Sequence, residues 1–149
     1  MIGKRILPPV IFAGAIALMV VLHLLMPGPQ WPTGPSRAVG ALLVFAGIAL
    51  NVYCAKLFED RRTAIKPYEE SSKLVVDGPY RYTRNPMYLG LLSILGGIGL
   101  LLGSTVPFVV IPVFALVITQ RFILVEEAML AKRFGAAYAG YCRSVRRWL

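Results

Sequence analysis

A long apolar stretch at residues 87–120 decides how this chain folds, and it reads MYLGLLSILGGIGLLLGSTVPFVVIPVFALVITQ. It carries no charged side chain, and its two halves are joined only by the Gly-Ser-Thr segment 103–105. A helix needs about 17 to 25 apolar residues to cross the hydrocarbon core of a bilayer, and each half approaches the lower limit. The stretch therefore predicts two membrane spans, at 87–103 and 105–120, that form a tight helical hairpin.

Two more apolar stretches, at residues 6–26 and 38–58, are long enough to cross a bilayer. The chain has 149 residues, of which 57% are hydrophobic, and its mean hydropathy is +0.67. Such a composition is far more apolar than that of an ordinary soluble domain. We therefore predict a single all-α domain over residues 1–149, a polytopic membrane protein with about four transmembrane helices.

The first apolar stretch has a second interpretation, because Lys4 and Arg5 precede it as they would in a secretory signal peptide. We favour a retained span, since the run is long for such a peptide and no convincing cleavage site closes it before Pro27. The stretch is therefore counted as the first of the four predicted helices.

Basic residues predict the orientation of the chain, because Lys and Arg accumulate in the cytoplasmic loops of membrane proteins. With four spans and both termini on one side, all of the 16 Lys and Arg residues except Arg37 fall on that side. We therefore expect an integral membrane protein with cytoplasmic N- and C-termini, in the bacterial inner membrane. Attraction of these cations to anionic lipid explains the net charge of +9, so no nucleic-acid binding is expected.

Two polar clusters lie on that cytoplasmic face, one at each end of the hairpin. Residues 78–90 read GPYRYTRNPMYLG and combine cations, aromatic rings and a proline next to the start of a span. Glu126 and Glu127 follow the second arm of the hairpin. A cationic and aromatic cluster beside a carboxylate pair is suited to a small zwitterionic ligand, and S-adenosylmethionine is such a ligand.

The spacing of these residues resembles that of a known family, the integral-membrane methyltransferases, which include isoprenylcysteine carboxyl methyltransferases and phospholipid methyltransferases. Their signature has a Leu-Val pair, Gly and Tyr, then Arg-His-Pro-x-Tyr, then a hydrophobic hairpin and Glu-Glu-x-x-Leu-x-x-x-Phe-Gly-x-x-Tyr. The matching residues here are Leu74, Val75, Gly78, Tyr80, Arg84, Asn85, Pro86, Met87, Tyr88, Glu126, Glu127, Leu130, Phe134, Gly135 and Tyr138. The resemblance runs from Leu74 to Trp148, about half of the chain.

The resemblance implies that residues 72–90 and 121–142 hold S-adenosylmethionine. It implies cofactor-binding roles for Lys73, Leu74, Val75, Tyr80, Arg84, Asn85, Pro86, Met87, Tyr88, Glu126 and Glu127. It also implies catalytic roles for Glu126 and for Arg121, which is the arginine nearest to the glutamates although displaced by one residue from the family position. Asn85 stands where better-known members have His, so it can position a ligand but cannot shuttle protons.

Several of these residues also have a purely structural interpretation. Arg84 can pair with a ligand carboxylate through two parallel hydrogen bonds, or it can simply mark the cytoplasmic start of a helix. Tyr80 and Tyr88 can stack on adenine or face the sulfonium, whereas Tyr82 is better explained as an interfacial aromatic residue. Glu126 can accept hydrogen bonds from ribose hydroxyls or an ammonium group, or it can stabilise a helix dipole; we favour the ligand.

A metal centre is not expected. The single histidine, His23, has no partner acids or thiols nearby in the sequence, so a zinc site is not indicated. Cys54 lies in the second apolar stretch and Cys142 on the predicted C-terminal helix, and both are predicted to be free thiols.

The segment after the glutamates carries an amphipathic helical pattern. Its apolar residues recur at steps of three and four on one face, namely Leu130, Phe134, Tyr138, Tyr141, Val145 and Trp148. Cations lie off that face, so this cytoplasmic helix can rest on the membrane surface and also fold over the site. They are Lys132, Arg133, Arg143, Arg146 and Arg147. Gly135 predicts a bend within this helix.

These observations favour methyl transfer from S-adenosylmethionine to a lipid or prenylated small molecule that enters from the bilayer. The methyl acceptor can be an isoprenylcysteine-like carboxylate or a phospholipid amine, and the sequence leaves both open, as it does the oligomeric state. An NADPH-dependent membrane reductase of similar architecture is the first alternative, although no Gly-x-Gly-x-x-Gly fingerprint supports it. A non-catalytic membrane subunit is the second. A transporter is disfavoured, because none of the seven acids lies inside the four apolar stretches.

Overall fold

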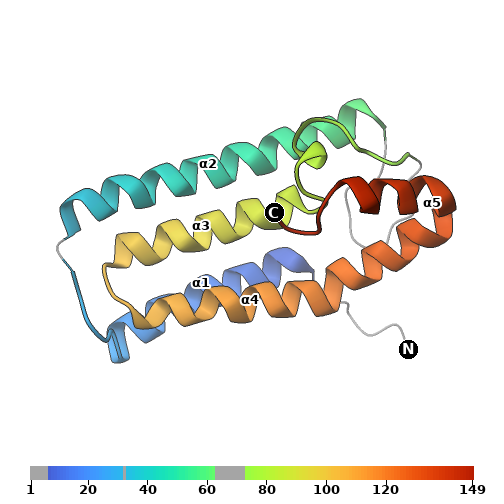
Figure 1. Ribbon diagram of the computed structural model, residues 1–149. Coiled ribbons are helices and arrows are strands. Elements are labelled where there is room, and N and C mark those ends of the chain that lie inside the picture. The colour runs from blue at the N-terminus through green and yellow to red at the C-terminus, as the bar shows by residue number, and fades with distance from the viewer. Residues whose placement is uncertain (1–6, 32, 63–72) are drawn as a thin grey trace.

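The computed structural model describes residues 7–31, 33–62 and 73–149, and within them it contains helices and no strands. In chain order these are α1 (Pro8–Leu25), α2 (Thr33–Asp60), the 3₁₀ turn η1 (Gly78–Arg81), α3 (Pro86–Leu102), the 3₁₀ turn η2 (Val106–Val109), α4 (Val110–Ile118), the π-helical turn η3 (Thr119–Ile123) and α5 (Leu124–Ser144). The long helices lie roughly parallel or antiparallel, with α2 along α3 and α1 along α4 (Figure 1). The predicted all-α fold is confirmed. Lys4, Arg5, residue 6 of the first predicted span and residue 72 of the predicted cofactor region lie outside the described residues.

In the described part of the chain, three helical segments are long and apolar enough to cross a membrane, namely α1, α2 and the continuous stretch Val106–Ser144. The helix α3 is also apolar but has 17 residues, which at 1.5 Å per residue extend about 25 Å. That length is close to the roughly 30 Å of the hydrocarbon core. The structure is thus that of a polytopic membrane protein, as predicted, although α2 is longer at both ends than the predicted span 38–58.

The fourth predicted span, 105–120, does not end where the sequence pattern placed its boundary. The chain passes from η2 through α4 and η3 into α5 without a break. This stretch has 39 residues, and the part of it before the break at Gly135 extends about 43 Å, well beyond the roughly 30 Å of the hydrocarbon core. Because charged residues begin at Arg121, the apolar first half is the part that can lie in the membrane, and α5 projects beyond it.

Glycines hold α2 directly against α3. A Cβ atom added to Gly47 would lie 2.4 Å from the carbonyl oxygen of Gly90, and one added to Gly40 would lie 2.7 Å from that of Gly97. Between these two contacts, Ser93 Oγ donates a hydrogen bond of 2.9 Å to the carbonyl of residue 43. Small residues permit such close backbone approach between membrane helices. The two helices therefore form a rigid pair whose ends are fixed relative to each other.

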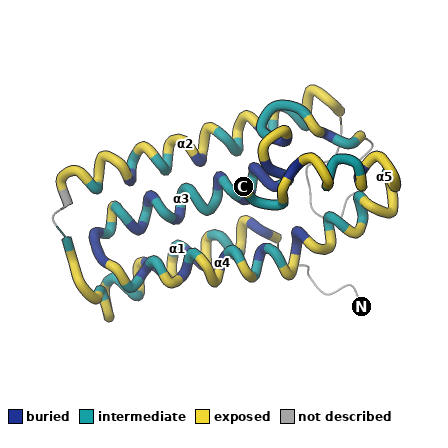
Figure 2. The backbone as a smooth tube through the Cα atoms, in the orientation of Figure 1, coloured by how far each residue is buried: buried dark blue, intermediate teal, exposed yellow. Residues whose placement is uncertain are grey.

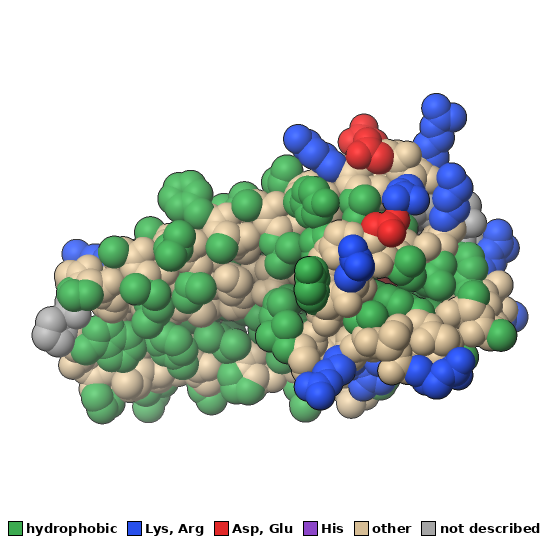
Figure 3. Space-filling model, turned by 45° about the horizontal axis from the view of Figure 1, so that its top comes forward, with side chains coloured by type: hydrophobic (Ala, Val, Ile, Leu, Met, Phe, Trp, Pro, Cys, Tyr) green, Lys and Arg blue, Asp and Glu red, His purple; other side chains and the backbone are tan. Residues whose placement is uncertain are grey.

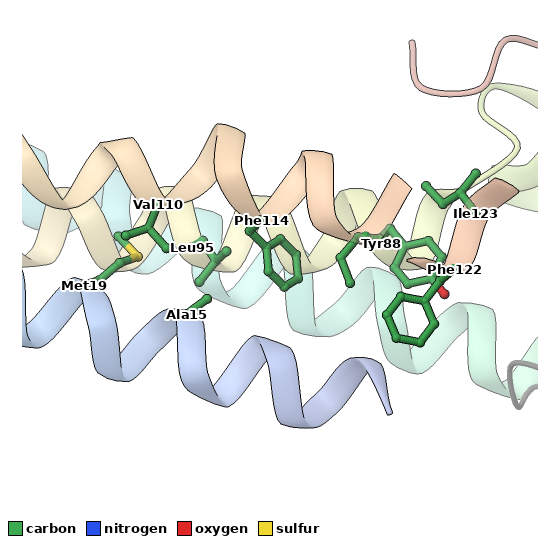
Figure 4. Packing of buried hydrophobic residues seen from close by; sticks show 9 residues of the cluster. Ala15, Met19, Tyr88, Leu95, Val110, Phe114, Phe122 and Ile123 are labelled. Carbon is green, nitrogen blue, oxygen red and sulfur yellow. The ribbon is translucent and has the colours of Figure 1, made fainter. Parts of the chain in front are cut away.

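A second contact joins α1 to α3 and α4 through buried apolar side chains. Met19 of α1, Leu95 of α3 and Val110 of α4 point toward one another in Figure 4 and are almost completely buried. The outer faces of the helices remain exposed along their length (Figure 2) and carry apolar side chains such as Leu42 and Phe45. This pattern is the one expected for a bundle whose outer surface faces lipid.

The turn of the hairpin is fixed by contacts with the loop that follows α1. Gly103 ends α3 in the left-handed conformation, with φ of 72°, which glycine adopts without a steric penalty. Ser104 is fully buried and its Oγ lies 2.8 Å from His23 Nδ1. The backbone amide of Thr105 donates to the carbonyl of Pro29. These bonds satisfy polar groups at the end of the bundle opposite to α5.

The helix α5 is broken at Gly135, which has φ of 49° and ψ of −120°. This break confirms the predicted bend, and beyond it the chain turns back so that the C-terminus lies beside the start of α3 (Figure 1). The prediction of one continuous helical face through Trp148 is wrong. The helix ends at Ser144 and Val145 has an extended backbone, because the last residues pair with another segment of the chain instead of continuing the helix.

Candidate functional site

The two predicted polar clusters meet at one end of the bundle. Because α3 and the following helix run antiparallel, the start of α3 lies beside the start of α5. Tyr88, in the first turn of α3, donates a hydrogen bond of 2.8 Å from its Oη to Oε1 of Glu126. Tyr88 is buried and Glu126 is half-buried. This bond joins the aromatic cluster directly to the carboxylate pair.

The surroundings of Glu126 favour its neutral form. The residue lies after the charged boundary at Arg121 and so outside the apolar part of the helix. Burial raises the pKa of Glu126 to about 7, and the negative charge of Glu127 adds to the increase, while the hydrogen bond from Tyr88 opposes it. At neutral pH the carboxyl group is therefore present in both protonation states. A group in that state can accept a hydrogen bond or exchange a proton.

Glu127 lies between two guanidinium groups. Arg147 donates from Nε to Oε1 at 2.9 Å and from Nη2 to Oε2 at 2.7 Å, so it grips both carboxylate oxygens. Arg84 Nη1 approaches Oε1 at 3.3 Å. The hydrogen bond to Glu127 raises the pKa of Arg147 above its usual value. Such two-pronged pairing is the strongest geometry available to an arginine and a carboxylate.

Arg84 is held inside the cluster rather than at the surface. Its side chain is 14% exposed, and Nη1 lies 2.6 Å from the sulfur of Cys142. Among the described residues, its buried Nε has no hydrogen-bond partner. Buried donors are nearly always paired in folded proteins, so this nitrogen is a place where a bound acceptor group would be accommodated.

The C-terminal residues lie directly against the start of α3. The amide of Arg84 donates to the carbonyl of Arg146 at 2.9 Å. Thr83 Oγ1 and Asn85 Nδ2 donate to the carbonyl of Arg147 at 3.1 Å and 2.9 Å. Asn85 is buried and is the residue before the first helical turn. Its amide therefore anchors the C-terminal tail, in addition to the ligand contact that the sequence predicts.

Tyr80 is packed inside the protein. Its ring meets the edge of Phe58 with centroids 5.5 Å apart, and it belongs to a buried cluster with Val75 and Cys54. Tyr141 Oη donates to the carbonyl of Tyr80 at 2.7 Å. Burial raises the pKa of Tyr80 far above its usual range, so the phenol stays neutral. The predicted stacking of Tyr80 on adenine remains a prediction.

The other predicted residues occupy varied positions around this cluster. Pro86 is buried in the first turn of α3, where its missing amide proton costs nothing. Met87 is half-buried against the Tyr80 cluster. Lys73 is exposed and Leu74 is half-buried. Arg121 is exposed on the π-helical turn, and its predicted catalytic role is not tested by this arrangement.

An open groove runs beside the cluster, with a volume of about 500 Å³. Its lining comes from the segment before η1 and from the returning half of α5, namely Leu74, Val76, Arg81, Ala137, Tyr141, Ser144 and Val145. The volume falls in the range of small-molecule sites. Leu74 was predicted to bind the cofactor, whereas Glu126 and Arg84 do not line the groove. Tyr141 lines the groove and also donates the hydrogen bond to the carbonyl of Tyr80.

Charge is strongly segregated over the molecule. Figure 3 shows apolar side chains over the helical bundle, and most of the visible Lys and Arg side chains gathered at the end that carries α5. This end is also the one at which Tyr88 bonds to Glu126 and Arg84 pairs with Glu127. In the described part of the chain, no group of three or more His, Cys, Asp or Glu residues could hold a metal ion.

The sequence interpretation missed several residues that complete the cluster. Arg147 and Cys142 were assigned only as a surface cation and a free thiol, and Thr83 was not singled out. Their roles depend on the return of the chain after Gly135. Gly135 was the feature of the sequence that could have revealed them. A chain that reverses direction at this glycine brings its last residues back to the start of α3.

Comparisons with known proteins give a consistent result. The family described as "Phospholipid methyltransferase" matches residues 35–137. A 63-residue stretch is 44% identical to an uncharacterized protein of Haemophilus influenzae, covering 42% of this chain and all of that protein. Over 75 residues the chain is 40% identical to protein-S-isoprenylcysteine O-methyltransferase of Schizosaccharomyces pombe, covering 48% of this chain and only 30% of that enzyme. No solved structure matches the chain significantly.

Proposed function

The chain belongs to the phospholipid methyltransferase family, and we propose that it transfers a methyl group from S-adenosylmethionine to a lipid or amphipathic acceptor. The observation that carries the proposal is the bond between Tyr88 and Glu126, with the buried guanidinium of Arg84 in the same cluster. It unites the two family motifs at the charged end of a membrane bundle. A ligand with an ammonium group, a carboxylate and ribose hydroxyls matches these opposite charges.

The residues present are chemically suited to this ligand. Among the residues that the structure describes, Arg84 has a buried donor without a partner, and a guanidinium binds a carboxylate such as that of the methionyl moiety. Glu126 can accept hydrogen bonds from the ammonium group or from ribose hydroxyls. Tyr88 fixes the carboxyl group of Glu126 in place. The neighbouring groove, which includes Leu74, offers apolar surface for the nucleoside part. We expect Lys73, Val75, Met87 and the other predicted residues to complete the binding site for this ligand.

The bound donor supplies an activated methyl group on a sulfonium centre. The tasks left to the protein are to align donor and acceptor and to exclude water, since positive charge is lost as the new bond forms. An anionic carboxylate acceptor needs no base. A protonated amine must first lose a proton, and Glu126, whose pKa is about 7, is matched to accept it.

Membrane placement supports an acceptor that arrives through the bilayer. The cluster lies where the apolar helices end and the charged segment begins. We place this end at the cytoplasmic surface of a bacterial inner membrane, with both termini on that side, because cations gather there. A lipid headgroup or the polar end of a prenylated compound would reach the cluster at that depth.

A transfer assay tests the proposal. The purified protein in lipid vesicles would receive S-adenosylmethionine labelled in its methyl group, with either an aminophospholipid or a prenylcysteine analogue as acceptor. We expect label in one acceptor, and a loss of at least about tenfold for Glu126→Gln and Arg84→Gln. Arg143→Gln, which removes an exposed cation from the same end, is the matched control and should retain activity.

The outcomes separate the rival functions. Absence of label in every acceptor, from a folded protein, contradicts catalysis and favours a non-catalytic membrane subunit. Oxidation of NADPH in the same preparation supports the reductase alternative instead.

A further inference from the structure

The pairing of Arg147 with Glu127 goes beyond what the family motifs describe, because the family match ends at residue 137. Arg147 occupies both oxygens of Glu127, and Arg84 stands 3.3 Å from one of them. Two guanidinium groups thus share one carboxylate, which leaves positive charge in excess. The guanidinium of Arg84 contributes to this excess, and its Nε has no hydrogen-bond partner within the described ranges.

We propose that Arg147 is a positioning residue, which keeps Arg84 available for the carboxylate of the ligand by neutralising Glu127. The inference rests on the proposed function, and it extends that function to a residue outside the matched family region. Without Arg147, the unneutralised carboxylate of Glu127 would draw the guanidinium of Arg84 into a two-pronged pair of its own. Glu127 would then neutralise the charge of Arg84, and Arg84 would bind the carboxylate of a ligand more weakly.

The C-terminal tail is built so that the Arg147 side chain can serve this purpose. The tail is fixed through its backbone, because the carbonyls of residues 146 and 147 accept hydrogen bonds from Thr83, Arg84 and Asn85. Val145, the residue before them, is buried. None of these contacts uses the Arg147 side chain. Substitution of that side chain should therefore leave the tail in place and change only the charge and hydrogen bonding at Glu127.

The two glutamates therefore have different roles. Glu126, with its bond to Tyr88, faces the ligand, whereas Glu127 is the anchor through which the tail acts on Arg84. A lysine at position 147 keeps the charge but cannot make the planar two-pronged contact. We therefore expect the planar geometry of the Arg147 guanidinium, and not its charge alone, to set the position of the Glu127 carboxylate.

Calorimetric binding of S-adenosylhomocysteine to detergent-purified variants tests this inference. For Arg147→Gln we expect the Kd to rise about tenfold, the size of effect seen when one partner of a coupled charge network is removed. Arg147→Lys should fall between Arg147→Gln and the native protein. Arg146→Gln is the matched control, because it removes the neighbouring exposed cation, and its Kd should not change.

The double variant Arg147→Gln with Glu127→Gln gives a readout that a merely structural role would not produce. Once Glu127 is neutral it no longer captures Arg84, so binding should return to within about threefold of the native value. An unchanged Kd in Arg147→Gln, or a double variant as weak as the single one, overturns the inference while leaving the proposed function intact. Absence of binding by the native protein overturns the proposed function, and the inference with it.

Discussion

At the scale of single residues, Glu126 is the group whose state depends most on its surroundings. Its carboxyl group is buried beside another acid and receives one hydrogen bond from Tyr88. An acid with a raised pKa gains its proton already as the pH falls through about 7. It then loses the negative charge that attracts an ammonium group or accepts from a hydroxyl.

This behaviour predicts pH-dependent binding. The Kd for S-adenosylhomocysteine should rise about tenfold when the pH is lowered from about 8 to about 6, since the carboxylate fraction of Glu126 falls by that factor. Calorimetric titrations across this range measure the effect. Glu126→Gln should bind weakly at every pH with a flat profile. A slope that persists in Glu126→Gln would assign the titration to another group.

Tyr88 provides a second prediction at the residue scale. Tyr88→Phe removes the hydroxyl that fixes Glu126 but keeps the buried ring. The loss of one hydrogen bond to a charged group corresponds to about 1.5–3 kcal/mol, so methyl-transfer activity should fall by at least about tenfold. Activity assays and thermal unfolding of the same sample separate this effect from misfolding. Full activity in Tyr88→Phe would remove Tyr88 from the site.

At the scale of elements, the close contact of α2 with α3 decides where the start of α3 lies. Gly47→Ala places a methyl group against the carbonyl of Gly90, and overpacking of this kind costs about 1–3 kcal/mol. We expect a lower midpoint of thermal unfolding in detergent. Gly96→Ala is the matched control on α3, because a Cβ there meets nothing within 4 Å. Equal stability of both variants would contradict the packing of these helices.

The same elements show how far a sequence can be interpreted alone. The hairpin, its turn at Gly103 and the bend at Gly135 were predictable, because each depends on local composition and on glycine. The meeting of Arg147 with Glu127 was not. It requires the extended backbone at Val145 and the pairing of the tail with Thr83 and its neighbours, which are contacts between segments about 60 residues apart. The family motif identified Glu126 and Arg84, but their mutual geometry comes only from the folded chain.

At the scale of the whole molecule, the segregation of charge predicts orientation. A green fluorescent protein fused after Leu149 should fluoresce, because this reporter becomes fluorescent on the cytoplasmic side of the membrane. Alkaline phosphatase fused at the same point should be inactive, because it becomes active only on the opposite side. Phosphatase fused after Gly103, at the opposite end of the bundle, should be active. The reverse pattern would place the polar cluster on the outer face and contradict the cytoplasmic assignment.

We propose that Arg84, Tyr88 and Glu126 bind a sulfonium methyl donor at the end of a membrane bundle. Calorimetric titration of the detergent-purified native protein tests it most directly, with S-adenosylmethionine, S-adenosylhomocysteine and NADPH as ligands. We predict saturable binding of the first two, weakened by Arg84→Ala and by Glu126→Ala, and no binding of NADPH. Binding of NADPH alone, or of none of the three by a folded sample, would contradict the claim.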